Sequence, residues 1–345
     1  MSDTTPNPYR TVLDTLATRK RVLVTTHVRP DGDTLGSSVA LILGLRTKGI
    51  DAELLLLSRL PRKYAFIVHD NAVTAHVADP ELPASLADLS RFDGFVVCDT
   101  GTWSQLPGLK DRVLGWDVPK LVVDHHLTQE DWATAKLVVT QAAAAAEVVA
   151  ELLDRWGVPV DAPMAAALFL GLASDTGWFQ FSNTRPYTLR LAARLIEAGV
   201  DTDRMYQLLY QNERAERVAL QTRAQQSLEL LADGRLAVMR VYKRDFAQTR
   251  ADVPDTENLI NIPLQIRTVQ ASILITEPLE GGPVRVSLRS KGQVDVARFA
   301  ERFGGGGHAR AAGLKLDGTV EQVHDTVVTA MVEALGTVPA SDQVE

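Results

Sequence analysis

The stretch Arg21–Thr47, RVLVTTHVRPDGDTLGSSVALILGLRT, decides the fold class of this 345-residue chain. Its first six residues, RVLVTT, are a short run rich in valine and leucine, which predicts a buried strand. A helical pattern follows from about Thr34 to the end of the stretch. Pro30 and Gly32 place a turn between the strand and the helix. A buried strand, a polar turn and a helix are typical of an α/β protein.

The rest of the first half repeats this alternation of apolar runs and helical patterns. Further strands are expected over residues 54–57, 92–98, 120–124 and 136–139. Helices are expected over residues 142–156, 163–174 and 186–198. Valine- and leucine-rich runs separated by helices indicate a mainly parallel sheet that is covered on both faces.

The pattern changes after residue 200. Residues 201–231 are polar, rich in arginine and glutamine and helical in pattern, which predicts a connector between domains. A second, smaller α/β region follows, with strands over 236–242, 271–276 and 284–288 and helices over 294–302 and 320–335. We therefore expect two α/β domains, the second with a mixed sheet. The expected boundaries are 8–200 for the first domain, 201–231 for the helical connector, 232–337 for the second domain and 338–345 for a tail.

Composition excludes several classes of protein. Cys98 is the single cysteine, so a disulfide framework and a Cys-rich zinc site are ruled out. The N-terminus lacks the apolar core of a secretory signal, and no apolar run reaches the length of a membrane span. We expect a cytoplasmic protein without a membrane partner.

Taken alone, the net charge of −7 argues against a nucleic-acid substrate. Its distribution changes that interpretation. Residues 201–315 carry 17 Lys+Arg against 14 Asp+Glu, whereas residues 316–345 carry six acids and no base. The acidity is therefore compatible with a short nucleic acid. The sequence shows no large basic face, so we expect no binding of long duplexes.

Four polar segments follow predicted strands or end a predicted helix. They are His27-Val-Arg-Pro-Asp31-Gly-Asp33, Asp99, Asp124-His125-His126 and Asp175. In open α/β sheets, ligand sites gather at the carboxyl ends of the strands. Alone, each segment also fits a polar turn or a helix cap, such as Asp33 capping the helix that follows it.

Taken together, the four segments favour a metal site. The candidate ligands are His27, Asp31, Asp33, Asp99, His125 and Asp175. Imidazole and carboxylate ligands without thiolate suit Mn²⁺, with Mg²⁺, Co²⁺ and Zn²⁺ as alternatives. Six ligands suit two divalent ions, about 3.5–4 Å apart, that share a bridging carboxylate and a bridging water. The charges of two such ions and four carboxylates cancel, so further cationic groups, with His126 as a candidate, should hold an anionic substrate.

The order of these motifs resembles the DHH phosphoesterase superfamily. Gly304-Gly305-Gly306-Gly307-His308, followed by Ala311-Ala312-Gly313, resembles the DHH-associated domain of one subfamily, as does the segment 288–292. That subfamily comprises bacterial oligoribonucleases (nanoRNases) and pAp phosphatases. The resemblance spans about residues 15–316.

The resemblance implies roles for individual residues. The six ligands would hold two Mn²⁺ ions, with Mg²⁺ or Co²⁺ as alternatives, and Asp99 would bridge them. Asp124 would orient His125, and His126 would contact the scissile phosphate or the attacking water. Arg289 and Gly304–His308 would bind the substrate phosphate and the terminal nucleotide. The residues support this last role independently, because arginine pairs bidentately with phosphate and consecutive glycines can present an anion nest.

Two segments depart from the family pattern. Residues 142–146 are all alanine, where many relatives carry Ser or Thr hydroxyls. Asn258-Leu-Ile-Asn261 stands where relatives often have a Glu-Gly pair. The substrate contacts of both segments stay open.

The implied activity is hydrolysis of short single-stranded RNA to 5′-mononucleotides, with dephosphorylation of pAp as an additional activity. The implied mechanism is in-line attack by a hydroxide that bridges two metals. One alternative is a phosphodiesterase acting on cyclic di-AMP or on the linear dinucleotide pApA. A manganese pyrophosphatase is disfavoured by Gly304–His308, and a non-enzymatic nucleotide-binding regulator by the complete ligand set. A homodimer is left open.

Overall fold

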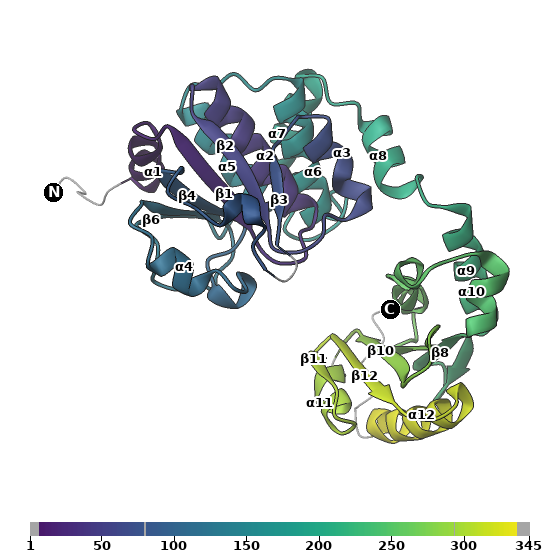
Figure 1. Cartoon of the computed structure of the whole chain (residues 1–345). Helices are drawn as coiled ribbons and strands as arrows, with labels where there is room; N and C mark the ends of the chain where they lie inside the picture. The colour runs from purple at the N-terminus through teal and green to yellow at the C-terminus, as the bar shows by residue number, and fades with distance from the viewer. Residues whose placement is uncertain (1–6, 79–80, 293, 337–345) are drawn as a thin grey trace. The chain divides into compact units, whose positions relative to one another are not determined.

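The structure is a computed structural model that describes residues 7–78, 81–292 and 294–336. The predicted tail, 338–345, lies outside the described residues. The chain divides between Asn212 and Glu213 into two compact units, whose elements are labelled in Figure 1. This division falls inside the segment for which the sequence predicts a connector.

The first unit is built on six parallel strands in the order β3-β2-β1-β4-β5-β6. The strands are β1 (Arg21–Thr26), β2 (Asp51–Leu56), β3 (Ala75–Val77), β4 (Gly94–Cys98), β5 (Lys120–Asp124) and β6 (Ala135–Val138). The predicted parallel sheet is therefore confirmed. Strand β3 was not predicted, because it has only three residues and no buried apolar run.

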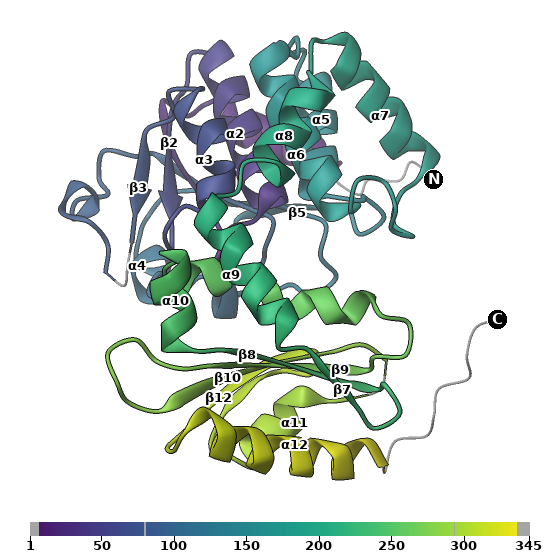
Figure 2. The same ribbon diagram turned by 90° about the vertical axis from the view of Figure 1, so that its right-hand side faces the viewer.

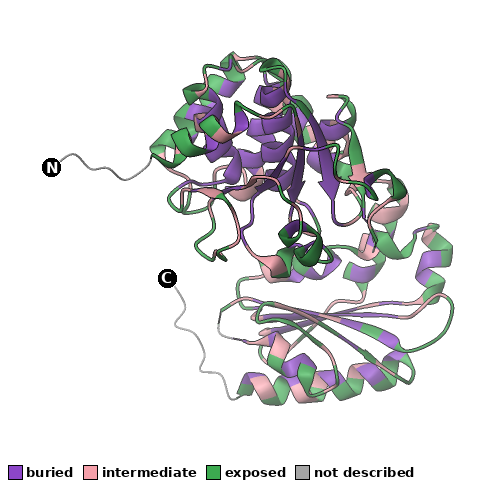
Figure 3. Cartoon of the chain, turned by 60° about the vertical axis from the view of Figure 1, so that its left-hand side comes forward, coloured by how far each residue is buried: buried purple, intermediate pink, exposed green. Residues whose placement is uncertain are grey.

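Helices cover both faces of this sheet, because successive strand residues point to opposite sides. The helices are α1 (Pro8–Leu16), α2 (Gly32–Thr47), α3 (Ala65–His69), α4 (Lys110–Leu114), α5 (Ala145–Arg155), α6 (Ala162–Asp175), α7 (Pro186–Glu197) and α8 (Thr202–Tyr210), with 3₁₀ turns η1 (Arg62–Tyr64), η2 (Ala84–Leu86) and η3 (Trp103–Gln105). In β1, Val22 and Val24 belong to the larger core with α2, α5 and α6, while Leu23 packs into a second core on the other face. Figure 3 shows the sheet and these central helices as the most buried part of the unit.

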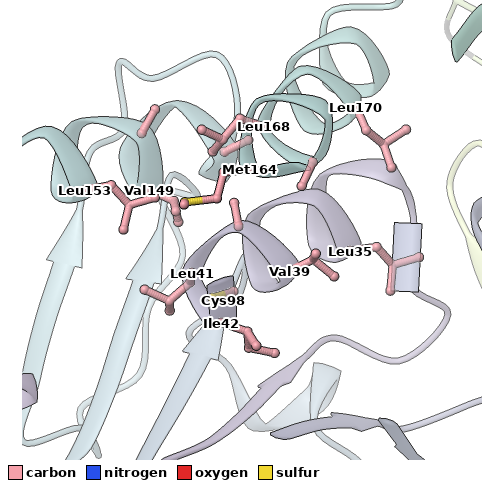
Figure 4. Packing of buried hydrophobic residues seen from close by; sticks show 14 of the residues in the cluster. Leu35, Val39, Leu41, Ile42, Cys98, Val149, Leu153, Met164, Leu168 and Leu170 are labelled. Carbon is pink, nitrogen blue, oxygen red and sulfur yellow. The ribbon is translucent and has the colours of Figure 1, made fainter. Parts of the chain in front are cut away.

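The backbones of helices α2 and α6 lie in close contact within the core drawn in Figure 4. A Cβ atom added at Gly36 would lie 2.3 Å from the carbonyl oxygen of Ala167. One added at Gly171 would lie 2.7 Å from Oδ1 of Asp33. Only glycine permits this approach. It brings the first turn of α2, which carries Asp33, next to the last turns of α6, which ends at Asp175.

The second unit holds a mixed sheet in the order β11-β12-β10-β9-β8-β7, in which β8 and β9 are parallel and the other pairs antiparallel (Figure 2). Its elements are α9 (Ala215–Gln226), β7 (Glu229–Leu231), β8 (Leu236–Val241), α10 (Lys243–Thr249), η4 (Val253–Thr256), η5 (Leu259–Gln265), β9 (Ala271–Thr276), β10 (Val284–Ser290), α11 (Val296–Glu301), β11 (Gly306–His308), β12 (Ala311–Leu316) and α12 (Val320–Gly336). Helices α11 and α12 pack on one face, and α9, α10 and η5 on the other.

The mixed sheet confirms the fold class predicted for this half, although β7, α10, β11 and β12 were not predicted. The predicted helical segment 201–231 contains two helices and then ends in strand β7, which pairs with β8. The glycine-rich segment also forms a strand, β11, which is described below. In the part of the chain that the structure describes, no helix is long and apolar enough to span a membrane.

Candidate metal centre

The candidate ligands gather at the carboxyl edge of the parallel sheet. His27 follows β1, Asp99 follows β4 and His125 follows β5. These three strands are neighbours, with β4 between β1 and β5. Asp33 lies in the first turn of α2, and Asp175 is the last residue of α6. The topology thus brings together residues that are up to about 150 positions apart in the sequence, as expected for a parallel sheet.

The ligand atoms fall into two principal groups, in each of which they lie within 4.8 Å of one another. One group is His27, Asp31 and Asp99, and the other is Asp33, His125 and Asp175. Asp99 faces both groups. Its Oδ2 lies 3.7 Å from Nε2 of His27, and its Oδ1 lies 3.4 Å from Nε2 of His125. A third, overlapping group joins Asp99 and His125 to His126.

Two buried polar atoms in this cluster indicate that it fits a cation. Oδ1 of Asp99 and Nε2 of His125 are buried, and neither makes a hydrogen bond within the described residues. A buried polar atom without a partner is costly, so such atoms usually serve a ligand. His125 Nε2 also lies 3.3 Å from Oδ2 of Asp175. Imidazole and carboxylate atoms converging in this way form a donor set for a divalent metal.

Electrostatics explain how the cluster tolerates so many carboxylates. Burial, reinforced by Asp99 and Asp175, raises the pKa of Asp33 well above its usual value. Burial also raises the pKa of Asp99 to about 8. Burial opposes the charged form of His125, but the adjacent carboxylates of Asp175 and Asp99 raise its pKa to about 11. Without a metal, the cluster therefore holds protons near neutral pH, and a metal ion has to displace them.

Asp33 is held by the start of helix α5. Its carboxylate is fully buried and accepts hydrogen bonds from the backbone N–H groups of Ala145 (2.6 Å) and Ala146 (2.9 Å). A helix N-terminus stabilises an anion through its free N–H groups and its dipole. The carbonyl oxygen of Ala142 is 3.2 Å from Nδ1 of His125. The alanine run thus contacts the site through its backbone groups, and these contacts require no side-chain hydroxyl.

Asp31 caps helix α2, which begins at Gly32 and not near Thr34. Its Oδ1 accepts hydrogen bonds from the N–H groups of Asp33 and Thr34, each at 3.0 Å. The alternative considered from the sequence, with Asp33 as the cap, is therefore wrong. Asp33 is left for the metal cluster, while Oδ2 of Asp31 lies 3.8 Å from Nε2 of His27.

Asp124 is buried beneath the two histidines that follow it. Its Oδ1 accepts hydrogen bonds from the backbone N–H groups of His125 (2.7 Å) and His126 (3.1 Å) and lies 2.8 Å from Nδ1 of His126. Asp124 therefore holds the backbone of His125. The His125 ring contacts the carbonyl oxygen of Ala142 instead. The hydrogen bond to Asp124 raises the pKa of His126, whose side chain is 53% exposed.

Arg289 lies on β10 in the second unit, paired across the sheet with Ser272 and Ala311. Its Nε donates to Oδ1 of Asn261, at 3.3 Å. The segment 258–261, which departs from the family pattern, thus orients this arginine. Nearby, Lys291 donates to the carbonyl oxygens of Leu264 and Ile266 at the end of η5, which is a structural role.

The glycine run, for which the sequence suggested an anion nest, forms part of a strand. Gly306–His308 is the edge strand β11, paired with β12. A Cβ at Gly305 or Gly307 would lie 2.4 Å from a backbone oxygen of β12, so these glycines allow the strands to approach. The N–H groups of Gly304 and Gly305 donate to Glu301 and Ala300, which leaves them unavailable for an anion nest. His308 is exposed at the end of β11.

Comparison with known families agrees with this architecture. Residues 21–172 match the model of the DHH family, N-terminal domain, and residues 233–336 match the DHHA1 domain. The chain belongs to the DHH family. Its DHH domain carries all the candidate metal ligands except Asp175, which lies three residues beyond the matched range, and its DHHA1 domain carries Arg289 and Gly304–His308.

Individual relatives extend the similarity over nearly the whole chain. The bifunctional oligoribonuclease and PAP phosphatase NrnA of Thermus thermophilus is 29% identical over 91% of this chain and 90% of its own length. The cyclic-di-AMP phosphodiesterase PdeA of Listeria monocytogenes is 27% identical over 90% of this chain but only 47% of its own length. A crystal structure of an exopolyphosphatase-related protein from Bacteroides fragilis superposes with a TM-score of 0.82, at 22% identity, covering 97% of this chain and 99% of the other, which shows a common fold.

Some contributors to the DHH site were not foreseen. Gln129 donates to Oδ2 of Asp124, and the carbonyl of Ala142 meets His125. A glutamine in a polar turn carries no distinctive pattern, and a backbone carbonyl has no side-chain signal at all. The structure was needed to find both.

Proposed function

We propose that this DHH-family hydrolase cleaves short oligoribonucleotides to 5′-mononucleotides with two bound divalent metal ions, and that it also dephosphorylates pAp. The observation that carries the proposal is the position of Asp99. Its two carboxylate oxygens face different ligand groups, as a residue shared by two ions requires. The similarity to the NrnA protein of Thermus thermophilus supports the choice of substrate.

In this proposal, His27, Asp31 and Asp99 hold one ion, and Asp33, His125 and Asp175 hold the second ion together with Asp99. Mn²⁺ suits this donor set best, with Mg²⁺ or Co²⁺ as alternatives. When bound, two such ions supply Lewis acidity and lower the pKa of water to about 7.

The protein's own residues then position and stabilise the substrate. Asp124 fixes the His126 ring through Nδ1, so Nε2 is the atom that donates to an oxygen of the scissile phosphate. The raised pKa of His126 favours the protonated ring, which attracts the anion. Arg289, oriented by Asn261, contributes a guanidinium that pairs with a further substrate phosphate. His308 and the edge strand β11 would meet the terminal nucleotide.

A phosphodiesterase acting on cyclic di-AMP or pApA is the second candidate. The relative from Listeria monocytogenes, matched over 90% of this chain, favours it. This chain corresponds to about half of that protein, so the similarity extends to the DHH and DHHA1 portion alone.

One substrate panel separates the candidates. Initial rates with Mn²⁺ would be measured for pAp, pApA, RNAs of three to ten nucleotides, cyclic di-AMP and pyrophosphate. We expect RNAs below about five nucleotides to be hydrolysed fastest, pAp measurably, and pyrophosphate not at all. Asp99→Ala should abolish every one of these activities, because it removes the carboxylate common to both ligand groups. Asp131→Asn, at a fully exposed acid outside the site, is the matched control and should keep them.

A higher kcat/KM for cyclic di-AMP than for any linear RNA would favour the second candidate. Turnover retained by Asp99→Ala under saturating Mn²⁺ would contradict the two-metal assignment.

A further inference from the structure

Helix α8 carries two tyrosines on its exposed face. Tyr206 and Tyr210 are 43% and 50% exposed, and their ring centroids lie 5.0 Å apart. An adjacent face of the helix is anchored in the core by Met205 and Leu209. Adjacent exposed apolar rings mark a binding surface more often than single exposed side chains do.

This ring pair is attached to the loop that follows Asp175. Trp178, three residues after that candidate ligand, has its ring centroid 5.2 Å from that of Tyr206 and 6.0 Å from that of Tyr210. Trp178 has a left-handed backbone, with φ of +56°. Such a conformation is costly for a large side chain and is typical of functional loops. The ring pair therefore packs against the loop that follows Asp175, a member of the group Asp33, His125 and Asp175.

Helix α8 also contacts the 3₁₀ turn η1, which lies in the loop region after β2. Tyr64 of this turn is buried. Burial raises the pKa of Tyr64, and the neighbouring Lys63 partly opposes this rise. The turn that carries Tyr64 is therefore in contact with the helix that carries Tyr206 and Tyr210. Figures 1 and 2 both show α8 beside α3, which directly follows η1.

The turn η1, which contacts α8, carries a positive charge. Lys63 is exposed, and its Nζ lies 4.6 Å from the centroid of the Tyr64 ring. The loop that carries η1 is hydrogen-bonded to the turn between the candidate ligands His27 and Asp31, because the backbone N–H of Arg29 donates to Oγ of Ser58 at 2.8 Å. Aromatic faces beside a cation match a nucleotide, which offers a base to stack and a phosphate to pair.

We propose that Tyr206 and Tyr210 form a nucleobase subsite that stacks the base of the nucleotide next to the scissile phosphodiester, while Lys63 pairs with that nucleotide's phosphate. This inference rests on the proposed function and deepens it. The subsite favours substrates with at least two nucleotides, because only they place a base on each side of the cleaved bond.

The test compares substrates that differ in one base. KM and kcat would be measured with pApA and with its two analogues in which one adenine is replaced by hydrogen. For the wild type, we expect one analogue to show a KM about tenfold higher, which corresponds to the loss of one stacked base. The variant Y206A/Y210A should show this higher KM with pApA itself and no further rise with that analogue. Its kcat should stay within about twofold.

Two controls separate stacking from a structural role. Tyr206→Phe with Tyr210→Phe keeps both rings and should restore the wild-type KM. Tyr187→Ala removes an exposed tyrosine of α7 and should leave the KM unchanged. A KM unaffected by Y206A/Y210A, or raised equally for pApA and both analogues, would overturn the inference. Failure of the wild type to hydrolyse any dinucleotide would instead contradict the proposed function, and the subsite with it.

Discussion

Asp99 and His125 each belong to two of the three candidate ligand groups. Asp99 directly follows a buried strand and adopts a left-handed backbone, with φ of +64°. This conformation is costly for a non-glycine residue and persists where the surrounding fold enforces it. It turns the carboxylate so that one oxygen faces each ligand group. His125 reaches the same point from the neighbouring strand with an Nε2 atom that has no hydrogen-bond partner in the described residues.

The protonation of His125 predicts how metal affinity depends on pH. Its pKa is raised to about 11, so at pH 7 the metal-free ring holds a proton that coordination must displace. Affinity for Mn²⁺ should therefore rise with pH, by about tenfold per pH unit for each proton displaced. Calorimetric titration in buffers of different ionisation enthalpy measures this release of protons. His69→Gln, at an exposed histidine outside the site, should keep the same slope. An affinity independent of pH between 6 and 8 would contradict the assignment of His125 as a ligand.

Arg289 is predicted to act on substrate binding. Arg289→Ala should raise KM about tenfold or more with little change in kcat, because it removes a charge-assisted contact to a phosphate distant from the reacting bond. Steady-state kinetics with a trinucleotide measures both constants. Arg298→Ala, at an exposed arginine of α11, is the matched control. An unchanged KM for Arg289→Ala would argue against phosphate binding there.

At the scale of elements, a buried ion cluster joins three neighbouring strands of the first unit. Glu53 of β2 is 3% exposed and accepts hydrogen bonds from Arg21 of β1 (2.5 Å), His76 of β3 (2.6 Å) and Arg91 (2.7 Å). Three partners satisfy both carboxylate oxygens, which makes burial of the charge tolerable. The cluster explains how the short strand β3 is held at the sheet edge without a buried apolar run.

Glu53→Gln should destabilise the first unit by about 2 kcal/mol at pH 7. This is less than the ~3–5 kcal/mol lost when a fully buried pair is broken, because both arginines reach solvent. Burial opposes ionisation of Glu53, but hydrogen bonds from His76 and Arg21 lower its pKa. The charge therefore stabilises the fold fully above the unfolded-state pKa of about 4.3, and the contribution is lost as the pH falls through the lower folded-state value. Denaturant unfolding of wild type and variant at pH 7 and pH 3 measures the difference, which should shrink at the lower pH. An equal difference at both values would contradict the role of the charge.

For the whole molecule, two sheets with separate cores indicate two folding units. The first unit buries one core on each face of its parallel sheet, and the second unit does the same with its mixed sheet. We propose the domain boundaries expected from the sequence, 8–200 and 232–337, with 201–231 as the connector. Helix α8 packs into the core of the first unit and α9 into that of the second, so each end of the connector stabilises its own unit.

This organisation predicts the behaviour of two fragments. Residues 1–212 and 213–345 should each unfold cooperatively when produced alone, and the first should bind Mn²⁺ as tightly as the full chain. Its kcat/KM for a trinucleotide should fall by about a hundredfold, because the residues proposed to position the substrate phosphate are absent. Circular dichroism, metal titration and kinetics measure the three properties. Undiminished activity of the fragment would show that Arg289 and His308 are dispensable.

The sequence by itself determined which residue types could hold a metal and on which strand ends they stand. Buried valine- and leucine-rich runs and polar turns are local patterns, and parallel strands place such turns along one edge. The four motifs were therefore sufficient to predict the fold class of the first half and the gathering of His27, Asp99 and His125.

Only the tertiary structure decided how these groups are supported. Ala145 donates to Asp33 across 112 positions, and the backbone of Ala142 meets His125, contacts that no side-chain pattern reveals. Strand β11 exists because its glycines fit against β12, although four glycines in sequence suggest a loop. Tyr206 and Tyr210 lie beside the ligand loops only because α8 packs there. Each of these features depends on close packing between segments distant in the chain, which local sequence patterns do not encode.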